Sequence, residues 1–354
     1  MILVINAGSS SIKTELFDAD LASLLSADVT GIGGRGRLRL GDRMEEVETL
    51  DHAGALDIVM TALDKAGYPL HRLTAAGHRV VHGGSRLTAP ARLTVEVQAE
   101  IAACIPLAPL HNPHNLEAVR ALARKAPHLA QFASFDTGFH ATNAEVATAY
   151  ALPGDWRDRG LRRYGFHGLS YAGMVEGFGA DLPERLLAFH LGNGASLCAI
   201  RNGQSVATSM GYSPLDGLTM GTRTGAIDGM AVLRLAEEIG IDAASRVLNR
   251  ESGLKALGGT NDMAVLLDRD DAEARFAVDH FCHWAARHAG SAIVAMGGVD
   301  AVAFTGGIGE NAAAIRDRIM EALSFFGGLP VHVVPAEEER QIARDALRLL
   351  AAGG

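Results

Sequence analysis

The residues that could carry chemistry gather in short strings rich in glycine and serine. The first, Asn6-Ala-Gly-Ser9-Ser-Ser11-Ile-Lys13, offers backbone N–H groups, three hydroxyls and one ammonium group. Such groups hold phosphate oxygens, although the string lacks the GxxxxGK[ST] pattern of a Walker loop. A second string, His190-Leu191-Gly192-Asn193-Gly194, is of the same kind. Two such turns are harder to explain as ordinary hairpin tips than one, so both are predicted to contact phosphate.

A third glycine-rich string is Gly306-Gly307-Ile308-Gly309-Glu310-Asn311. It follows an apolar run and leads into a helix-like segment, and the free N–H groups of a helix start favour anions. Its spacing also fits a variant of the dinucleotide fingerprint, so this string alone leaves ATP and NAD open. The spacing at 31–36 spells the same fingerprint, but no strong strand precedes it, and we expect a surface turn there.

Two arginines and one aspartate point to an anionic substrate. Arg79 stands on an apolar strand just before a glycine pair, and Arg223 stands between Gly221 and Gly225. A guanidinium fork matches two oxygens of a carboxylate or phosphoryl group. Asp136 ends an apolar strand, a common position for a base or a metal ligand.

Seven of the 14 histidines also lie in polar, glycine-rich strings: His78, His82, His111, His114, His140, His167 and His190. Zinc is one interpretation, because HxxH occurs at 111–114 and HxxxH at 78–82. Neither HExxH nor a Cys/His ligand set is present, and Pro113 disfavours a helical ligand face. Histidines that contact phosphoryl or carboxylate groups, or that satisfy buried backbone, are therefore preferred.

The elements that must position these residues follow an α/β pattern. Strand, small-residue turn and strand open the chain at 2–17 and recur at 186–200, which predicts a duplicated protein of two domains, 1–150 and 151–354. Further strands are predicted at 76–81, 131–135 and 331–334. Helices are predicted at 55–66, 94–103, 115–125, 228–239, 242–249, 272–296, 311–324 and 337–350, the last one packing back on the first domain. The segment 31–45 is expected to be weakly ordered.

Composition excludes several classes of protein. The 354 residues carry a formal net charge of −9 without a basic tract, which argues against nucleic-acid binding. No apolar run reaches the roughly 18 residues of a membrane span, and the start lacks the basic region of a signal peptide. Three cysteines without CxxC spacing suit a reducing compartment. We expect a cytoplasmic protein.

Taken together, the strings resemble the acetate kinase family, within the superfamily of acetate and sugar kinases, Hsp70 and actin. They are INAGSSSIK (5–13), GHRVVHGG (77–84), APLHNPHN (108–115), FDTGFH (135–140), RRYGFHGLS (162–170), FHLGNGASL (189–197), SMGYSPLDGLTMGTRTG (209–225) and TGGIGEN (305–311). The resemblance implies two duplicated actin/Hsp70-like (ribonuclease H-like) domains with a nucleotide cleft between them. The first would serve the acyl substrate and phosphate, the second the nucleotide.

The resemblance also implies an activity: reversible, Mg²⁺-dependent, direct in-line transfer of phosphoryl between ATP and acetate, giving acetyl phosphate and ADP, with Mn²⁺ as an alternative ion. A cytoplasmic homodimer that serves acetyl-CoA biosynthesis would follow. By motif position, Asn6 and Glu338 correspond to metal ligands, Asp136, His167 and Arg223 to catalytic residues, and Arg79 to the substrate-binding arginine. The acyl pocket corresponds to Val81, Leu110, Phe166 and Pro214. Nucleotide contacts correspond to Ser9, Ser11, Lys13, His190, Leu191, Gly192, Asn193, Gly194, Asp262, Gly307, Ile308, Gly309, Glu310 and Asn311.

The chain departs from the family pattern in places. The family's nucleoside motif contains an arginine, but the corresponding residues here are Asp262-Met263-Ala264. Glu337-Glu338-Glu339 stands where the family has Asn-Glu-Glu, so the metal ligand can be a glutamate next to Glu338. A propionate or broader short-chain acyl kinase is the alternative. An NAD-dependent oxidoreductase that uses the Gly307 string is a weaker alternative. Such an enzyme needs a carboxylate about 20 residues after the string, and Gly327-Gly328 stand there. A non-enzymatic, ATP-gated binding module is also weaker, because it would not need two glycine-flanked arginines.

Overall fold

Two compact units make up the computed structural model, which describes residues 1–49 and 51–353. Unit 1 is Met1–Phe139 with Glu337–Gly354, and unit 2 is His140–Ala336. The division thus lies at 139 and 337, where the sequence analysis placed a single boundary at 150. Residues 140–150 go with unit 2 because His140 and Thr142 hydrogen bond to Ser205.

The sheet of unit 1 has the strand order β5-β4-β3-β2-β1-β6-β8-β7. Strands β1, β6 and β8 run parallel, and the other neighbours pair antiparallel. The bounds are β1 (Ile2–Ala7), β2 (Ser11–Phe17), β3 (Ser23–Thr30), β4 (Gly34–Leu40), β5 (Arg43–Thr49), β6 (Ala75–Val80), β7 (Ala91–Arg92) and β8 (Ala130–Phe135). The carboxyl ends of β1, β6 and β8 therefore meet at one edge.

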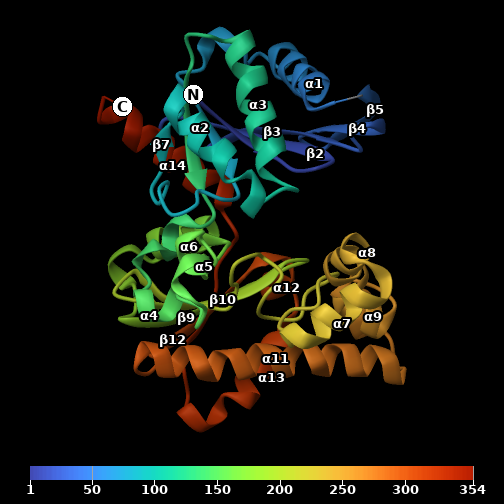
Figure 1. The fold of residues 1–354 in the computed structure, drawn as a ribbon. Helices are drawn as coiled ribbons and strands as arrows, with labels where there is room; N and C mark the ends of the chain where they lie inside the picture. Colours follow the sequence, from blue (N-terminus) through green and yellow to red (C-terminus); the bar gives the residue numbers. More distant parts are fainter. Residues whose placement is uncertain (50, 354) are drawn as a thin grey trace. The chain divides into compact units, whose positions relative to one another are not determined.

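Helices cover both faces of this sheet. Leu3 and Ile5 of β1 pack in one core with α1 (His52–Lys65) and α3 (Asn112–Lys125). The opposite face carries α14 (Glu338–Ala351), which contacts β1, β6 and β8. At Gly77 of β6 a Cβ would lie 2.7 Å from Ile342 of α14, so only glycine admits this approach. Figure 1 shows α14, coloured red, beside strands some 200 residues earlier in the chain. The unit also contains α2 (Val95–Ala103), η1 (Leu70–Arg72) and η2 (Ile105–Leu107).

The expectation of weak order at 31–45 is wrong. Residues 34–49 form the hairpin β4–β5, which turns at Gly41 with φ 56°. The alternation Arg37-Leu38-Arg39-Leu40 is a strand pattern: Leu38 is buried in the core, while Arg37 is exposed. The many arginines obscured that alternation.

The sheet of unit 2 has the order β11-β10-β9-β12-β13. Its bounds are β9 (Arg185–Leu191), β10 (Ala195–Arg201), β11 (Gln204–Thr208), β12 (Ala301–Thr305) and β13 (Val331–Val333). Three strands pair antiparallel in chain order, and β12 and β13 are parallel additions beside β9. The segment β3-β2-β1-β6-β8 of unit 1 has the same arrangement. This repetition confirms the predicted α/β class and its duplication.

Helices dominate the rest of unit 2. The longest, α11 (Ala272–Met296), packs on β9, β10 and β11 and has the predicted bounds. The predicted helix 242–249 is α8 (Ile241–Arg246) followed by a π-helical turn, η5 (Val247–Glu251). The predicted helix 311–324 is α13 (Ala313–Ala322), and the glycine-rich string before it forms a short helix of its own, α12 (Gly306–Asn311). The others are α4 (Glu145–Thr148), α5 (Gly154–Asp158), α6 (Gly168–Phe178), α7 (Gly229–Ile239), α9 (Gly253–Gly258) and α10 (Met263–Asp268), with short turns η3 (Gly138–Thr142), η4 (Gly179–Asp181) and η6 (Ser324–Phe326). Within the described part of the chain, no helix is long and apolar enough to cross a membrane.

Candidate functional site

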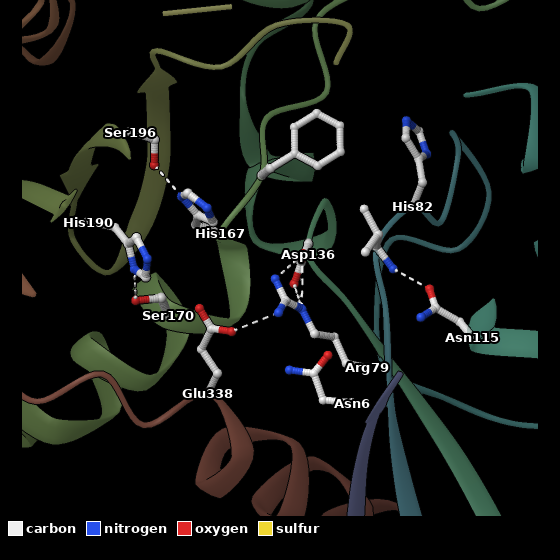
Figure 2. A network of polar contacts seen from close by, with 12 residues as sticks. Asn6, Arg79, His82, Asn115, Asp136, His167, Ser170, His190, Ser196 and Glu338 are labelled. Atoms are coloured by element: carbon white, nitrogen blue, oxygen red, sulfur yellow. Dashed lines mark hydrogen bonds and ion pairs between the residues drawn. The ribbon is translucent and has the colours of Figure 1, made fainter. Parts of the chain in front are cut away.

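A buried ion pair stands at the carboxyl ends of the parallel strands in unit 1 (Figure 2). Arg79 Nε donates to both carboxylate oxygens of Asp136 at 3.1 and 3.2 Å, and Arg79 Nη2 donates to Oδ2 at 2.7 Å. Asp136 is 2% exposed, and it follows β8 directly while Arg79 lies in β6. The pairing of these strands brings together two residues that are 57 positions apart.

A second carboxylate shares this arginine. Glu338 Oε2, at the start of α14, lies 3.3 Å from Arg79 Nη1. Burial by itself lowers the pKa of Arg79, but the charges of Asp136 and Glu338 outweigh it and raise that pKa. Burial raises the pKa of the Asp136 carboxyl, and Arg79 opposes that rise. Asp136 therefore holds the guanidinium in one orientation with its Nη1 directed at Glu338.

Asn6 faces the same helix. Its Nδ2 donates to Glu339 Oε1 at 3.4 Å, so Glu338 pairs with Arg79 and Glu339 with Asn6. Burial raises the pKa of Glu15 on the neighbouring strand, and the charge of Glu339 adds to the rise. Acidic groups thus outnumber basic ones around Asn6. The atoms that could bind a cation are carboxylate and amide oxygens, the ligands that hard cations such as Mg²⁺ prefer. The residues present fit such an ion.

A polar network fixes α14 behind these carboxylates. Asp345 is 7% exposed and accepts from Ser134 Oγ at 2.8 Å and from Gln341 Nε2 at 2.9 Å. Burial raises the pKa of Asp345 to about 6, against the lowering effect of these two hydrogen bonds. Because Ser134 lies in β8 two residues before Asp136, the network sets the helix relative to the ion pair.

Two asparagines of the string 108–115 fix the backbone near the ends of β1 and β6 by hydrogen bonds. Asn115 Oδ1 accepts from Val81 N at 3.2 Å, while its Nδ2 donates to Ala7 O at 2.8 Å. Asn112 accepts from His82 N and donates to His82 O. Pro113 lies in the first turn of α3, where a missing N–H costs nothing, so α3 includes His114 contrary to expectation.

The first glycine-serine string forms the turn between β1 and β2. Gly8 N donates to Ser11 O at 2.8 Å. Ser9, Ser10 and Lys13 are exposed, and Ser11 is partly so. These polar groups remain accessible to a ligand.

In unit 2 a chain of hydrogen bonds orients His167, which precedes α6 and has the left-handed φ of 58°. Its Nδ1 lies 2.8 Å from Ser196 Oγ, and Tyr171 Oη lies 2.5 Å from the same oxygen. The His167 ring stacks on His190 with 4.1 Å between centroids, and His190 Nδ1 lies 2.9 Å from Ser170 Oγ. Figure 2 shows both histidine–serine pairs. Both Nδ1 atoms are thus held by serines.

Arg223 is a desolvated cation. Its Nη1 donates to Pro214 O at 2.6 Å. Burial lowers the pKa of Arg223, and within the described part of unit 2 no carboxylate forms an ion pair with it. A Cβ at Gly194 would lie 3.2 Å from His167 Nε2 and 3.3 Å from Arg223 Nη2, so both groups meet at this glycine. A desolvated, partly buried guanidinium without an ion-pair partner in its own unit is a site for an anion.

The third glycine-rich string and Asp262 are partly engaged in local structure. Glu310 Oε1 accepts from Gly306 N and Ala336 N, both at 3.0 Å, and Asn311 Nδ2 donates to Gly307 O at 2.8 Å. Asp262 caps α10 by accepting from Ala264 N at 2.9 Å. Gly307 is exposed, and Ile308 is partly so, while Gly309 is buried against β12. Thr305 Oγ1, which precedes the string, is buried without a hydrogen-bond partner.

Three of the predicted histidines serve structure. Burial lowers the pKa of His78, His82 and His140 to about 4, so their rings are neutral. His78 bonds Gln131, and the His140 ring nitrogens lie 2.9 Å from Ser205 Oγ and Phe166 O. The residues proposed for the acyl pocket are divided between the units. Val81 and half-exposed Leu110 belong to unit 1, and buried Phe166 and partly buried Pro214 belong to unit 2.

Sequence reasoning missed Ser196, Tyr171 and Asn115, whereas Glu339 lies one residue from the predicted ligand Glu338, within the slip that the sequence analysis allowed. A signal for Ser196 exists, because it stands in the string FHLGNGASL and pairs with His190 across β9 and β10. Tyr171 carries no such signal, since an aromatic residue one turn into a helix is more often part of the core.

The protein is a duplicated α/β protein with an ion-paired arginine in one unit and a desolvated arginine beside a histidine in the other. These features define a class of enzymes that bind anionic substrates. The chain matches the Acetokinase family over residues 1–344. It is 40% identical to the acetate kinase of Nitrobacter hamburgensis, covering 99% of this chain and 96% of that protein. The chain belongs to the acetokinase family.

Solved structures agree. The propionate kinase of Francisella tularensis is 32% identical with a TM-score of 0.93, covering 98% of this chain and 99% of that one. The acetate kinase of Porphyromonas gingivalis is 33% identical with a TM-score of 0.90, covering 99% of each chain. The predicted family and the predicted class, a phosphotransferase, are confirmed. The Nitrobacter alignment spans 393 positions against 354 residues here, so this chain lacks some residues that the relative has.

Proposed function

We propose that this acetokinase transfers the γ-phosphoryl group of ATP to acetate, reversibly and with Mg²⁺. A carboxylate oxygen of acetate forms a bond to phosphorus while the bond to the ADP oxygen breaks, in line, giving acetyl phosphate and ADP. Acetate is ionised at neutral pH, so positioning and charge neutralisation matter more than a base. The observation that carries the proposal is Arg223, a desolvated guanidinium next to His167 Nε2 that forms no ion pair within the described part of unit 2.

In unit 1, Arg79 binds the acetate carboxylate, and Asp136 fixes its guanidinium through the three hydrogen bonds that the pair shares. Val81 and Leu110, with Phe166 and Pro214 of unit 2, contact the acyl group. Asp136 has its oxygens engaged by Arg79, so its proposed role is orientation and not nucleophilic attack.

In unit 2, Arg223 and His167 donate to the equatorial oxygens of the phosphoryl group in flight. When Tyr171 donates to Ser196 and Ser196 donates to His167 Nδ1, the proton of the ring stands at Nε2 and is available for that donation. Nucleotide phosphates are proposed at His190–Gly194 and Gly307–Asn311, with Ser9, Ser11 and Lys13 contributing from unit 1, and Asp262 on the nucleoside side.

Asn6 and Glu338 are proposed to hold Mg²⁺, or Mn²⁺ in its place. The ion neutralises charge on the nucleotide phosphates when it is bound. Glu339, which contacts Asn6, supports the ligand set from the next position on α14.

Further parts of the proposal come from family membership. The protein is proposed to be a cytoplasmic homodimer. Its product, an acyl phosphate, is an activated acyl donor suited to acetyl-CoA formation.

Propionate is the second candidate substrate. The Francisella structure, a propionate kinase, superposes as well as the Porphyromonas acetate kinase, with TM-scores of 0.93 and 0.90. The fold therefore does not separate the two substrates, and only kinetics can.

The test is to incubate the protein with ATP, Mg²⁺, acetate and hydroxylamine and to measure acyl hydroxamate together with ADP. We expect acetyl hydroxamate in equal amount to ADP, and its loss when acetate or Mg²⁺ is left out. ADP formed without hydroxamate would mean an ATPase and would overturn the proposal. Arg234→Ala, which changes an exposed ion pair on α7, serves as the control variant.

A further inference from the structure

Three side chains outside the proposed active site form a second cluster of metal-binding groups in unit 1. His52 begins α1, and His114 and Glu117 are neighbours one turn apart on α3. One ligand atom of each lies within 4.8 Å of the others. The cluster lies on the face of the sheet that α1 and α3 cover, opposite the face that carries α14.

The carboxylate of Glu117 approaches both imidazoles without a hydrogen bond to either. Its Oε2 lies 3.6 Å from His52 Nδ1 and 3.9 Å from His114 Nδ1, both beyond hydrogen-bond length. His114 Nδ1 is buried and has no hydrogen-bond partner. Such an atom is costly to bury unless something binds it, and the converging oxygen leaves room for a cation between the three groups.

The second ring nitrogen of His52 is already fixed. Its Nε2 lies 2.6 Å from Gly8 O, and a carbonyl oxygen only accepts, so Nε2 carries the proton. The lone pair of His52 therefore stands at Nδ1, the atom that faces Glu117. A backbone carbonyl that binds the far N–H is the usual outer support of a metal-ligating histidine.

The two imidazoles lie next to each other beside Glu117. Their rings stack with 4.5 Å between centroids and 17° between planes. Near-parallel rings direct their lone pairs side by side, so His114 must turn about its Cβ–Cγ bond to complete a site. Its side chain is 30% exposed and its Nδ1 has no bond to break, which permits that turn.

We propose that His52, His114 and Glu117 bind a Zn²⁺ ion, with a fourth position left to water. Two imidazoles and one carboxylate suit Zn²⁺, whereas Mg²⁺ prefers an all-oxygen set. Glu117 is 41% exposed, which gives the ion an entry path from solvent. The ion joins α1 to α3, and through His52 it restrains the Gly8 carbonyl in the turn between β1 and β2.

The test uses the full chain, stripped of metal with a chelator and returned to buffer with excess Mg²⁺ to fill oxygen-only sites. Zn²⁺ binding is measured by competition with a chromophoric chelator, and Co²⁺ is used as a spectroscopic probe of coordination. The variants are His114→Ala and Glu117→Gln, and the control is His128→Ala, an exposed histidine of the same unit. The unfolding temperature without metal reports whether each variant folds.

We expect one Zn²⁺ per chain, weakened at least about tenfold in His114→Ala and Glu117→Gln and unchanged in His128→Ala. Added Zn²⁺ should raise the unfolding temperature of wild type and His128→Ala but not of the other two variants. Zn²⁺ binding of equal strength in all four proteins would place the ion elsewhere, for instance at the histidines of α11, and would overturn the proposal. Absence of binding in wild type would overturn it as well.

Discussion

The two arginines of the site differ in how their charge is balanced. Arg79 is shared by Asp136 and Glu338, so its position is fixed before any substrate arrives. Arg223 is desolvated and bonded to a backbone carbonyl, so its charge is available to an anion. A pre-oriented group suits a ground-state substrate, and an uncompensated one suits charge that develops during transfer.

Arg223→Ala is expected to lower kcat by about 10²–10⁴ while the KM for ATP changes little, because one charge-assisted donor to the phosphoryl in flight is lost. Steady-state kinetics in the acetate-to-acetyl-phosphate direction measures both constants. Arg234→Ala on the surface should be unchanged. Wild-type turnover in Arg223→Ala would remove this residue from the mechanism.

Ser196→Ala is expected to lower kcat about tenfold or more, because His167 Nδ1 loses the partner that fixes its tautomer. KM for acetate should stay near the wild-type value, and the pH dependence of kcat should shift. Ser196→Thr keeps the hydroxyl and should recover much of the rate. If Ser196→Ala loses only stability and keeps both kcat and its pH profile, then Ser196 does not position His167.

At the scale of residues, the sequence analysis identified the charged groups of the site but not the residues that orient them. Arg79, Asp136 and Arg223 stand out by charge in apolar or glycine-rich strings. Ser196 and Tyr171 are ordinary core-compatible residues, and their importance depends on the strand register and on the helix that follows His167. His52 was even harder to identify from the sequence, because it lies 62 residues before His114 and no spacing rule connects the two.

At the scale of elements, α14 is the contributor most distant in sequence from the strands it serves. It lies at the far end of the chain, yet it supplies Glu338 and Glu339 to residues of β1 and β6. The sequence predicts the helix from its apolar periodicity, and its start and end are within one residue of expectation. Which sheet it covers depends on the close approach at Gly77 and on the buried carboxyl of Asp345.

Asp345→Asn is expected to stabilise the protein at pH 8 by up to about 3 kcal/mol. The folded-state pKa is raised from 3.8 to about 6, so the folded state binds a proton more tightly than the unfolded state does. The stability linked to that proton is fully present below about pH 3.8 and is lost as pH rises through about 6. An amide can still accept from Gln341 and donate to Ser134.

Urea unfolding between pH 4.5 and 8 measures the difference between Asp345→Asn and wild type. The difference should grow with pH and level off above about 7. Asp271→Asn is the control, because its hydrogen bond from Arg269 lowers the pKa of that carboxyl to about 2, and it should give no gain at pH 8. A difference for Asp345→Asn that is constant across this range would mean that its carboxyl does not titrate there.

At the scale of the whole molecule, duplication was readable because each half opens with the same strand–turn–strand string. The order β3-β2-β1-β6-β8 in unit 1 matches β11-β10-β9-β12-β13 in unit 2. Prediction failed at one addition to this repeat, the hairpin β4–β5, which has no counterpart in the other half from which it could be inferred. The return of residues 337–353 to unit 1 is a second addition, where the sequence analysis expected the closing helix to pack back on the first domain.

Substrate choice is also a property of the whole chain, since the residues proposed for the acyl group come from both units. The backbone N–H of Val81 is fixed by Asn115 Oδ1 at 3.2 Å. Val81→Ala removes two methyl groups without disturbing that hydrogen bond. One methylene in an apolar pocket changes kcat/KM by roughly 10–200-fold, so acetate should be preferred to propionate in wild type, and butyrate should be nearly inactive.

In Val81→Ala the ratio of kcat/KM for propionate to that for acetate should rise, because the space vacated accepts the extra methylene. The ratio is measured by the hydroxamate assay with each acid, in wild type and in the variant. Val95→Ala, a highly exposed valine on α2, is the matched control and should leave the ratio unchanged. A wild type that prefers propionate would make the chain a propionate kinase, like the Francisella protein. A ratio that does not move in Val81→Ala would exclude contact between Val81 and the acyl group.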